Sequence, residues 1–121
     1  MTRGILGYIA AGLAGLTAAA HILIGTFDTV LPLWRSDLPF EIQGALQACF
    51  HFVSLFLLYS SWSFARAAPG AAAIARLWIG FGLCFLAVGI AGGALWSVPQ
   101  WLLLLPTGVV ALAAVRPRES A

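Results

Sequence analysis

The sequence predicts an all-α integral membrane protein, a bundle of four transmembrane helices in up-down order. Of its 121 residues, 62% are hydrophobic and only 8% are charged, which is more apolar than a soluble domain of this size can hide. Residues 4–27, 42–65, 77–98 and 100–115 lack Asp, Glu, Lys and Arg. These segments predict spans at about residues 4–27, 42–64, 76–97 and 99–115. A bilayer core of about 30 Å needs about 20 helical residues, so these spans make residues 1–121 one transmembrane domain.

The placement of arginine predicts how the bundle is oriented. The chain has no lysine, and five of its six cationic residues precede the first span, separate the second from the third or follow the fourth: Arg3, Arg66, Arg76, Arg116 and Arg118. Cytoplasmic segments are enriched in Lys and Arg, so both termini are expected in the cytoplasm. The net charge of +2 reflects this orientation and is no nucleic-acid footprint.

The N-terminal segment has two interpretations. "MTR", an apolar run and "TAAA" resemble a secretory signal that is cleaved after Ala20. We favour an uncleaved first span, because "HILIGTF" extends the apolar run to a full spanning length. If cleavage occurred, His21 would become the mature N-terminus and could bind a metal through its amine and its ring.

The first helix is expected to bury a histidine. One face carries small and polar residues at helical spacing: Ala14, Thr17, Ala18, His21, Gly25 and Asp28. Small residues let transmembrane helices approach closely, so this face should pack against another span and His21 should point into the bundle.

The second span carries a polar stripe that includes the other histidine. Its members are Gly44, Gln47, His51, Ser54, Leu58 and Ser61. Polar groups in hydrocarbon are costly, so this stripe should face protein or water. From the rise of a helix, His21 lies about 10 Å and His51 about 15 Å below the outer ends of their spans, with Gln47 near the level of His21. Adjacent antiparallel helices would then gather His21, Gln47 and His51 in one cluster, with Asp28 and Glu41 at its mouth.

The outer loop between Asp28 and Glu41 contains a helix-start signal. In "SDLPFE" we expect Ser36 or Asp37 to cap the second span and Glu41 to lie beside the positive end of its dipole. Capping competes with any ligand role for Asp37 and Glu41.

Three interpretations of the histidine cluster stay open. The first is an interhelical hydrogen-bond cluster of neutral imidazoles. The second is a ligand site in which His21 and His51, with Asp28 or Glu41, hold copper, zinc or iron or bracket a haem; the depth offset of about one turn argues against the haem. The third is a proton relay or quinone pocket that runs from Asp28 along the polar stripe.

Three stretches carry a family resemblance: "GLTAAAHIL", "EIQGALQACFHFVSLFL" and "PTG". In this layout the chain resembles an uncharacterised family of small four-span bacterial inner-membrane proteins that pairs a G-A-x-G-A-H element with a Y-Q-x-x-H element. Residues Thr17 to His21 depart from the first element, and Gln47 to His51 contains one residue too many for the second. The resemblance implies a multi-pass bacterial inner-membrane protein and no activity. By contrast, the small multidrug-resistance antiporters use a carboxylate deep in the first span, which this chain lacks.

The functional expectation is a non-enzymatic accessory or scaffold protein, or a complex subunit, in the lipid bilayer. The glycine-rich faces, such as Gly82, Gly89 and Gly93 in the third span, suit a homo-oligomer or packing within a larger membrane complex. The alternative is a metal- or haem-binding redox or ion- and proton-handling protein that uses His21 and His51. Neither a serine elbow, nor deep paired carboxylates, nor a phosphate-binding loop is found in the sequence.

Overall fold

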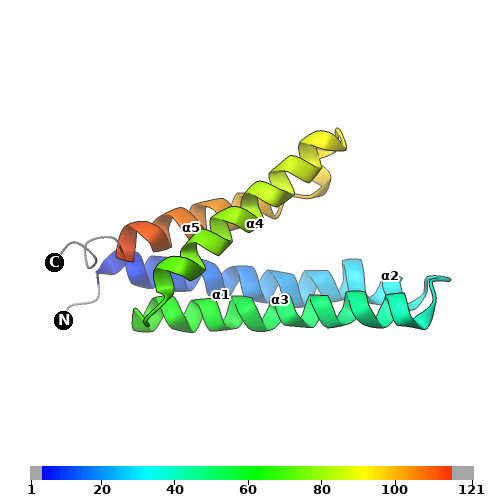
Figure 1. Ribbon diagram of the computed structural model, residues 1–121, viewed down its shortest axis with the longest axis horizontal. Coiled ribbons are helices and arrows are strands. Elements are labelled where there is room, and N and C mark those ends of the chain that lie inside the picture. The colour runs from blue at the N-terminus through cyan, green and yellow to red at the C-terminus, as the bar shows by residue number, and fades with distance from the viewer. Residues whose placement is uncertain (1–3, 116–121) are drawn as a thin grey trace.

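The computed structural model describes residues 4–115, and this range is all-α. Its four main helices are α1 (Ile5–Gly25), α3 (Phe40–Arg66), α4 (Ala71–Ala91) and α5 (Trp101–Val115). Successive main helices run in opposite directions (Figure 1). Three helical segments, Ile5–Trp34, Phe40–Arg66 and Ala71–Ala91, are long and apolar enough to cross a membrane, whereas α5 is shorter. The prediction of an all-α chain with several helices that are long and apolar enough to span a membrane is therefore confirmed.

The first helix continues beyond its expected end. A π-helical turn (Thr26–Val30) and the short helix α2 (Leu31–Trp34) extend it, so Asp28 lies in a helix and not at the start of a loop. Pro32 has no N–H with which to bond the carbonyl four residues earlier, and a π turn just before it absorbs that mismatch. The expected loop of residues 28–41 shrinks to Arg35–Pro39.

The start of α3 differs from the capping prediction. Pro39 is the N-cap residue and no side chain bonds the first turn, so the expected caps at Ser36 and Asp37 are wrong. Ser36 instead donates its hydroxyl to the Leu33 carbonyl at 2.6 Å, closing the preceding turn. Glu41 does lie in the first turn of α3, where the helix dipole favours an anion.

Helices α1 and α3 form an antiparallel pair through small residues. The hydroxyl of Ser61 donates to the Ala11 carbonyl at 2.8 Å, and a Cβ at Gly15 would lie 3.3 Å from the Ser61 hydroxyl oxygen. One turn farther along α3, a Cβ at Gly7 would lie 3.6 Å from the Phe64 carbonyl oxygen. Ala14, Thr17 and Ala18 of the face expected on the first helix are also buried, so that face packs, except at Asp28, which is exposed.

Helices α4 and α5 form the second close pair. A Cβ at Gly82 would lie 2.6 Å from Cγ of Leu105, and one at Gly108 would lie 2.9 Å from the backbone nitrogen of Ile79. Of the glycine face expected on the third span, Gly82 and Gly89 are thus occupied within the protein, whereas Gly93 lies beyond the end of α4 and a Cβ there would meet nothing within 4 Å. Pro106 lies inside α5, next to Leu105, whose side chain contacts Gly82.

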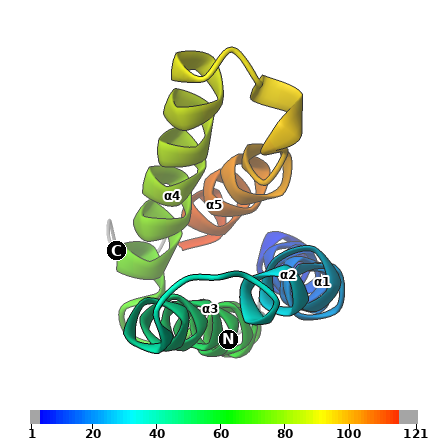
Figure 2. The same ribbon diagram turned by 90° about the vertical axis from the view of Figure 1, so that its right-hand side faces the viewer.

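The two pairs meet at one end and diverge toward the other (Figures 1 and 2). Where they meet, Trp78 of α4 is fully buried, and its ring centroid lies 6.5 Å from that of Phe56 and 6.3 Å from that of Phe64, both on α3. Farther along, α3 packs on α1 but not on α4, and Phe52 and Leu55 are 70% and 67% exposed. The large apolar surface of the diverging part suits contact with lipid.

Basic residues lie at one end of the fold, and all the acidic residues of the described range lie at the other end. Arg66 and Arg76 flank the α3–α4 turn, which uses left-handed backbone at Ala67 and Gly70 to reverse the chain. The other end carries Asp28, Arg35, Asp37 and Glu41. The start of α1 and the end of α5 lie at the arginine-flanked end, where Gly4 and Val115 line one cavity with the turn.

Candidate functional site

His21 joins α1 to α3 by a hydrogen bond and a ring stack. Its Nε2–H donates to the backbone carbonyl oxygen of Phe50 at 3.2 Å. The two rings are stacked, with centroids 4.2 Å apart and an interplanar angle of 21°. One turn beyond His21, a Cβ at Gly25 would lie 2.6 Å from Cε2 of Phe50, so glycine makes the space that Phe50 occupies. The sequence correctly placed His21 on the packed face.

The bond to Phe50 restricts the chemistry of the His21 ring. A carbonyl oxygen only accepts, so the bond requires a proton on Nε2 and leaves Nδ1 as the nitrogen that can accept a hydrogen bond or bind a metal. The same carbonyl oxygen also accepts the hydroxyl of Ser54 at 3.1 Å. For His21 alone, this geometry is an interhelical polar link; the cluster of both imidazoles in the first interpretation stays a prediction.

His51 is exposed and does not share the packed face with His21. Its ring meets the ring of Phe50 edge-on, with centroids 5.7 Å apart. Phe50 therefore contacts both imidazoles and takes the position opposite His21. The register places His21 level with residues 50 and 51, so the depth offset is smaller than expected, and Gln47 lies half-buried one turn away.

The two candidate carboxylates lie beyond the histidines and are both exposed. Asp28 belongs to the π turn and Glu41 to the first turn of α3. Within residues 4–115, no group of three or more His, Cys, Asp or Glu side chains is close enough to hold one metal ion. Metal or haem binding by His21 and His51 stays a prediction.

Sequence reasoning missed a second set of polar groups, in the region where the helix pairs meet. Ser63 of α3, Trp78 of α4 and Thr107 of α5 are fully buried, and within the described range their side-chain polar atoms have no hydrogen-bond partner. The neighbouring Ser60 satisfies its hydroxyl by donating to the Phe56 carbonyl at 2.7 Å. Little in the sequence signalled this set, because Trp78 stands at the edge of the predicted span 76–97, where an interfacial tryptophan is expected, and lies farther inside the helix only because α4 begins at Ala71.

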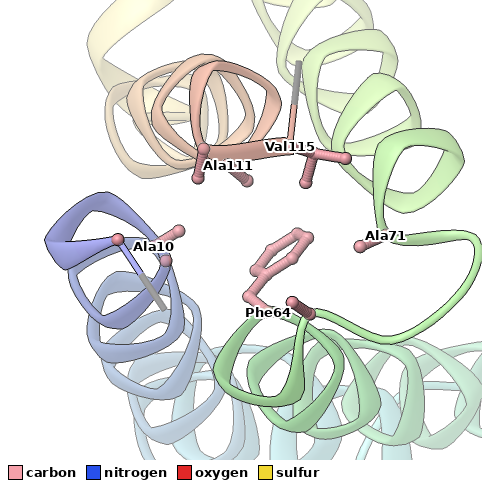
Figure 3. Close-up of a pocket in the computed structure, with 9 residues that line it drawn as sticks. Ala10, Phe64, Ala71, Ala111 and Val115 are labelled. Atoms are coloured by element: carbon pink, nitrogen blue, oxygen red, sulfur yellow. The ribbon is translucent and has the colours of Figure 1, made fainter. Parts of the chain in front are cut away.

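A small cavity lies at the arginine-flanked end of the bundle, where the two helix pairs meet (Figure 3). Its volume is about 20 Å³, and apolar side chains from all four main helices line it, including Ala10, Phe64, Ala71, Ala111 and Val115. A volume of this size holds about one water molecule, so it has no room for a metabolite. A wider hollow of about 350 Å³ lies at the α3–α4 turn, where Arg76 contributes to its lining.

Comparisons of the chain with protein-family models, with curated proteins and with solved structures give no match. The resemblance to the uncharacterised four-span family stays a prediction.

Proposed function

We propose that the protein is a four-span protein of the bacterial inner membrane with both termini in the cytoplasm. The arginines that flank the α3–α4 turn and the acidic residues at the opposite end support this orientation through the positive-inside rule. Helix α5 has 15 residues and is about 22 Å long. It becomes the fourth span if the flanking segment and local adjustment of the bilayer supply the remaining length.

Within that membrane, the protein acts as a non-enzymatic accessory protein or subunit of a membrane complex. The observation that carries this proposal is the bond from His21 to the Phe50 carbonyl at 3.2 Å. It gives the one histidine on a packed face a structural partner, and it joins two helices that approach closely at small residues, such as Gly15 beside Ser61. The interior is therefore built for close helix packing and not around a bound substrate.

An absorption spectrum and a metal analysis of the protein purified in detergent test this proposal. A structural bundle gives a colourless preparation with no stoichiometric metal. A Soret band, or one equivalent of bound copper, zinc or iron that a His51→Ala variant loses, would contradict it and establish the alternative, a metal- or haem-binding redox or ion-handling protein. Cys84→Ala is the matched control, because Cys84 is also exposed but lies on α4.

A further inference from the structure

The two helix pairs are tied more firmly within themselves than to each other. Hydrogen bonds from His21 and Ser61 join α1 to α3. Gly82 and Gly108 leave the space in which α4 and α5 approach closely. Between the pairs the contacts are apolar, with the ring of Trp78 against two phenylalanine rings of α3. Within residues 4–115, no side-chain hydrogen bond joins a helix of one pair to a helix of the other.

The pair junction, the region around Trp78 where the two pairs meet, buries three polar groups without a partner. Ser63, Trp78 and Thr107 are fully buried, and their side-chain polar atoms make no hydrogen bond in the part of the chain that the structure describes. By contrast, the buried hydroxyls of Thr17 and Ser60 each bond a carbonyl of their own helix at 2.7 Å. Neither of the two hollows described above is lined by any of the three residues, so neither supplies a water site beside them. Each unpaired group disfavours this closed arrangement by about tenfold.

The three unpaired groups lie near the arginine-flanked end of the fold. Ser63 precedes Arg66 by one turn, and Thr107 lies two turns from the end of α5. Trp78 lies about 10 Å along α4 from Ala71. The proposed membrane placement sets this end at the cytoplasmic surface, so a small separation of the pairs lets water reach these groups. Lipid offsets the loss of apolar contacts, because hydrocarbon tails are as apolar as the side chains that they replace.

We propose that the α4–α5 pair swings as one unit away from the α1–α3 pair about the α3–α4 turn, and that this opening hydrates Ser63, Trp78 and Thr107. Within the described range, the chain passes from one pair to the other only through residues 67–70. Two of these residues have left-handed backbone, Ala67 at φ 49° and Gly70 at φ 87°. Alanine disfavours that region, so a change in its backbone angles meets little resistance and the turn suits a hinge. The inference rests on the proposed membrane placement and adds a motion to it.

Labelling of a buried cysteine with N-ethylmaleimide in native membranes tests the opening. The exposed Cys49 and Cys84 are replaced by alanine in the full chain, and Ala111→Cys is introduced into that background. Ala111 is 1% exposed and lines the small cavity together with Ala10 of the other pair (Figure 3), so the new thiol reacts only when the pairs separate. Ala18→Cys is the control reporter, because Ala18 is fully buried on the face of α1 that packs and reports separation of α1 from α3. Ala111→Cys should react, and Ala18→Cys should stay unreactive.

Two pairs of variants in the Ala111→Cys chain separate opening of the pairs from other motions. Thr107→Val and Ser63→Ala each remove an unpaired hydroxyl, which favours the closed arrangement and slows labelling about tenfold. Thr17→Val and Ser60→Ala instead remove hydroxyls that bond carbonyls of their own helix at 2.7 Å, and they do not slow it. Ser63 belongs to α3, so its effect on a thiol of α5 distinguishes opening of the pairs from fraying of α5 alone.

Carbonate extraction of the same membranes shows whether each variant is inserted. If the protein resists extraction and Ala111→Cys is unreactive, the opening is wrong while the membrane placement stands. Loss of the protein from the membrane overturns both. The opening is also overturned if Ala18→Cys reacts as fast as Ala111→Cys, or if Thr107→Val and Ser63→Ala label as fast as their controls. Faster labelling of those two variants would show that water already pairs their hydroxyls in the closed arrangement, and it would overturn the opening as well.

Discussion

Gly108→Ala should destabilise the protein by separating α4 from α5. The new methyl group would lie 2.7 Å from Cγ1 of Ile79, 2.9 Å from the Ile79 nitrogen and 3.0 Å from the Ala75 carbonyl oxygen. Rotation of the Ile79 side chain relieves the first contact, but the other two are with backbone and require the helices to move apart. Overpacking of this kind costs about 2–3 kcal/mol, and the higher helix propensity of alanine returns about 1 kcal/mol. The expected net loss is about 1–2 kcal/mol.

Gly12→Ala is the matched control, because a Cβ at Gly12 meets nothing within 4 Å. It should gain about 0.5–1 kcal/mol from helix propensity alone. The two variants should therefore differ by about 2 kcal/mol, or about 30-fold in the unfolding equilibrium. Reversible unfolding in mixed detergent micelles, followed by far-ultraviolet circular dichroism, measures the difference. If Gly108→Ala is as stable as Gly12→Ala, the close α4–α5 contact is wrong.

Three further variants probe the α1–α3 pair in the same unfolding assay. His21→Ala removes the bond and the stack to Phe50 and should lower the free energy of unfolding by about 1–2 kcal/mol. His51→Ala should change the stability of the monomer by less than about 0.5 kcal/mol. Equal effects of the two variants would contradict the assignment of His21 as the packed histidine. Ser61→Ala removes one interhelical hydrogen bond and should cost about 0.6 kcal/mol, with an unchanged midpoint speaking against that bond. Gly25→Ala should push the Phe50 ring away from His21, which will shift the imidazole resonances of His21 in an NMR spectrum, and an unshifted spectrum would show that the ring stack does not form.

Periodicity in the sequence was enough to predict the packed face of α1. The spacing of Ala14, Ala18 and His21 depends only on helix geometry, and both alanines are fully buried with His21 bonded to α3. The same reasoning placed His51 on a polar stripe with Ser54 and Ser61. Of these three residues, Ser54 is buried, Ser61 reaches α1 and His51 is exposed. A stripe spans a wide arc of a helix, and the partner covers only part of that arc.

Other features depend on contacts between segments and could not be read from periodicity. The position of Phe50 opposite His21 follows from the space that Gly25 leaves on a different helix. The meeting of the two helix pairs at one end (Figure 1) includes the burial of Trp78 against Phe56 and Phe64 of α3, contacts that join residues on different helices. The helical path through Pro32 depends on a π turn, for which residue spacing gives no signal.

Labelling of single cysteines with a membrane-impermeant maleimide tests the proposed membrane placement most directly. Asp37 lies in the loop before α3 and Pro69 in the α3–α4 turn, and both are exposed. In the background without native cysteines, Asp37→Cys should react in intact cells, and Pro69→Cys should react only after the membrane is opened. Reaction of both positions in intact cells, or the reverse pattern, would contradict a bundle whose arginine-flanked turn lies in the cytoplasm.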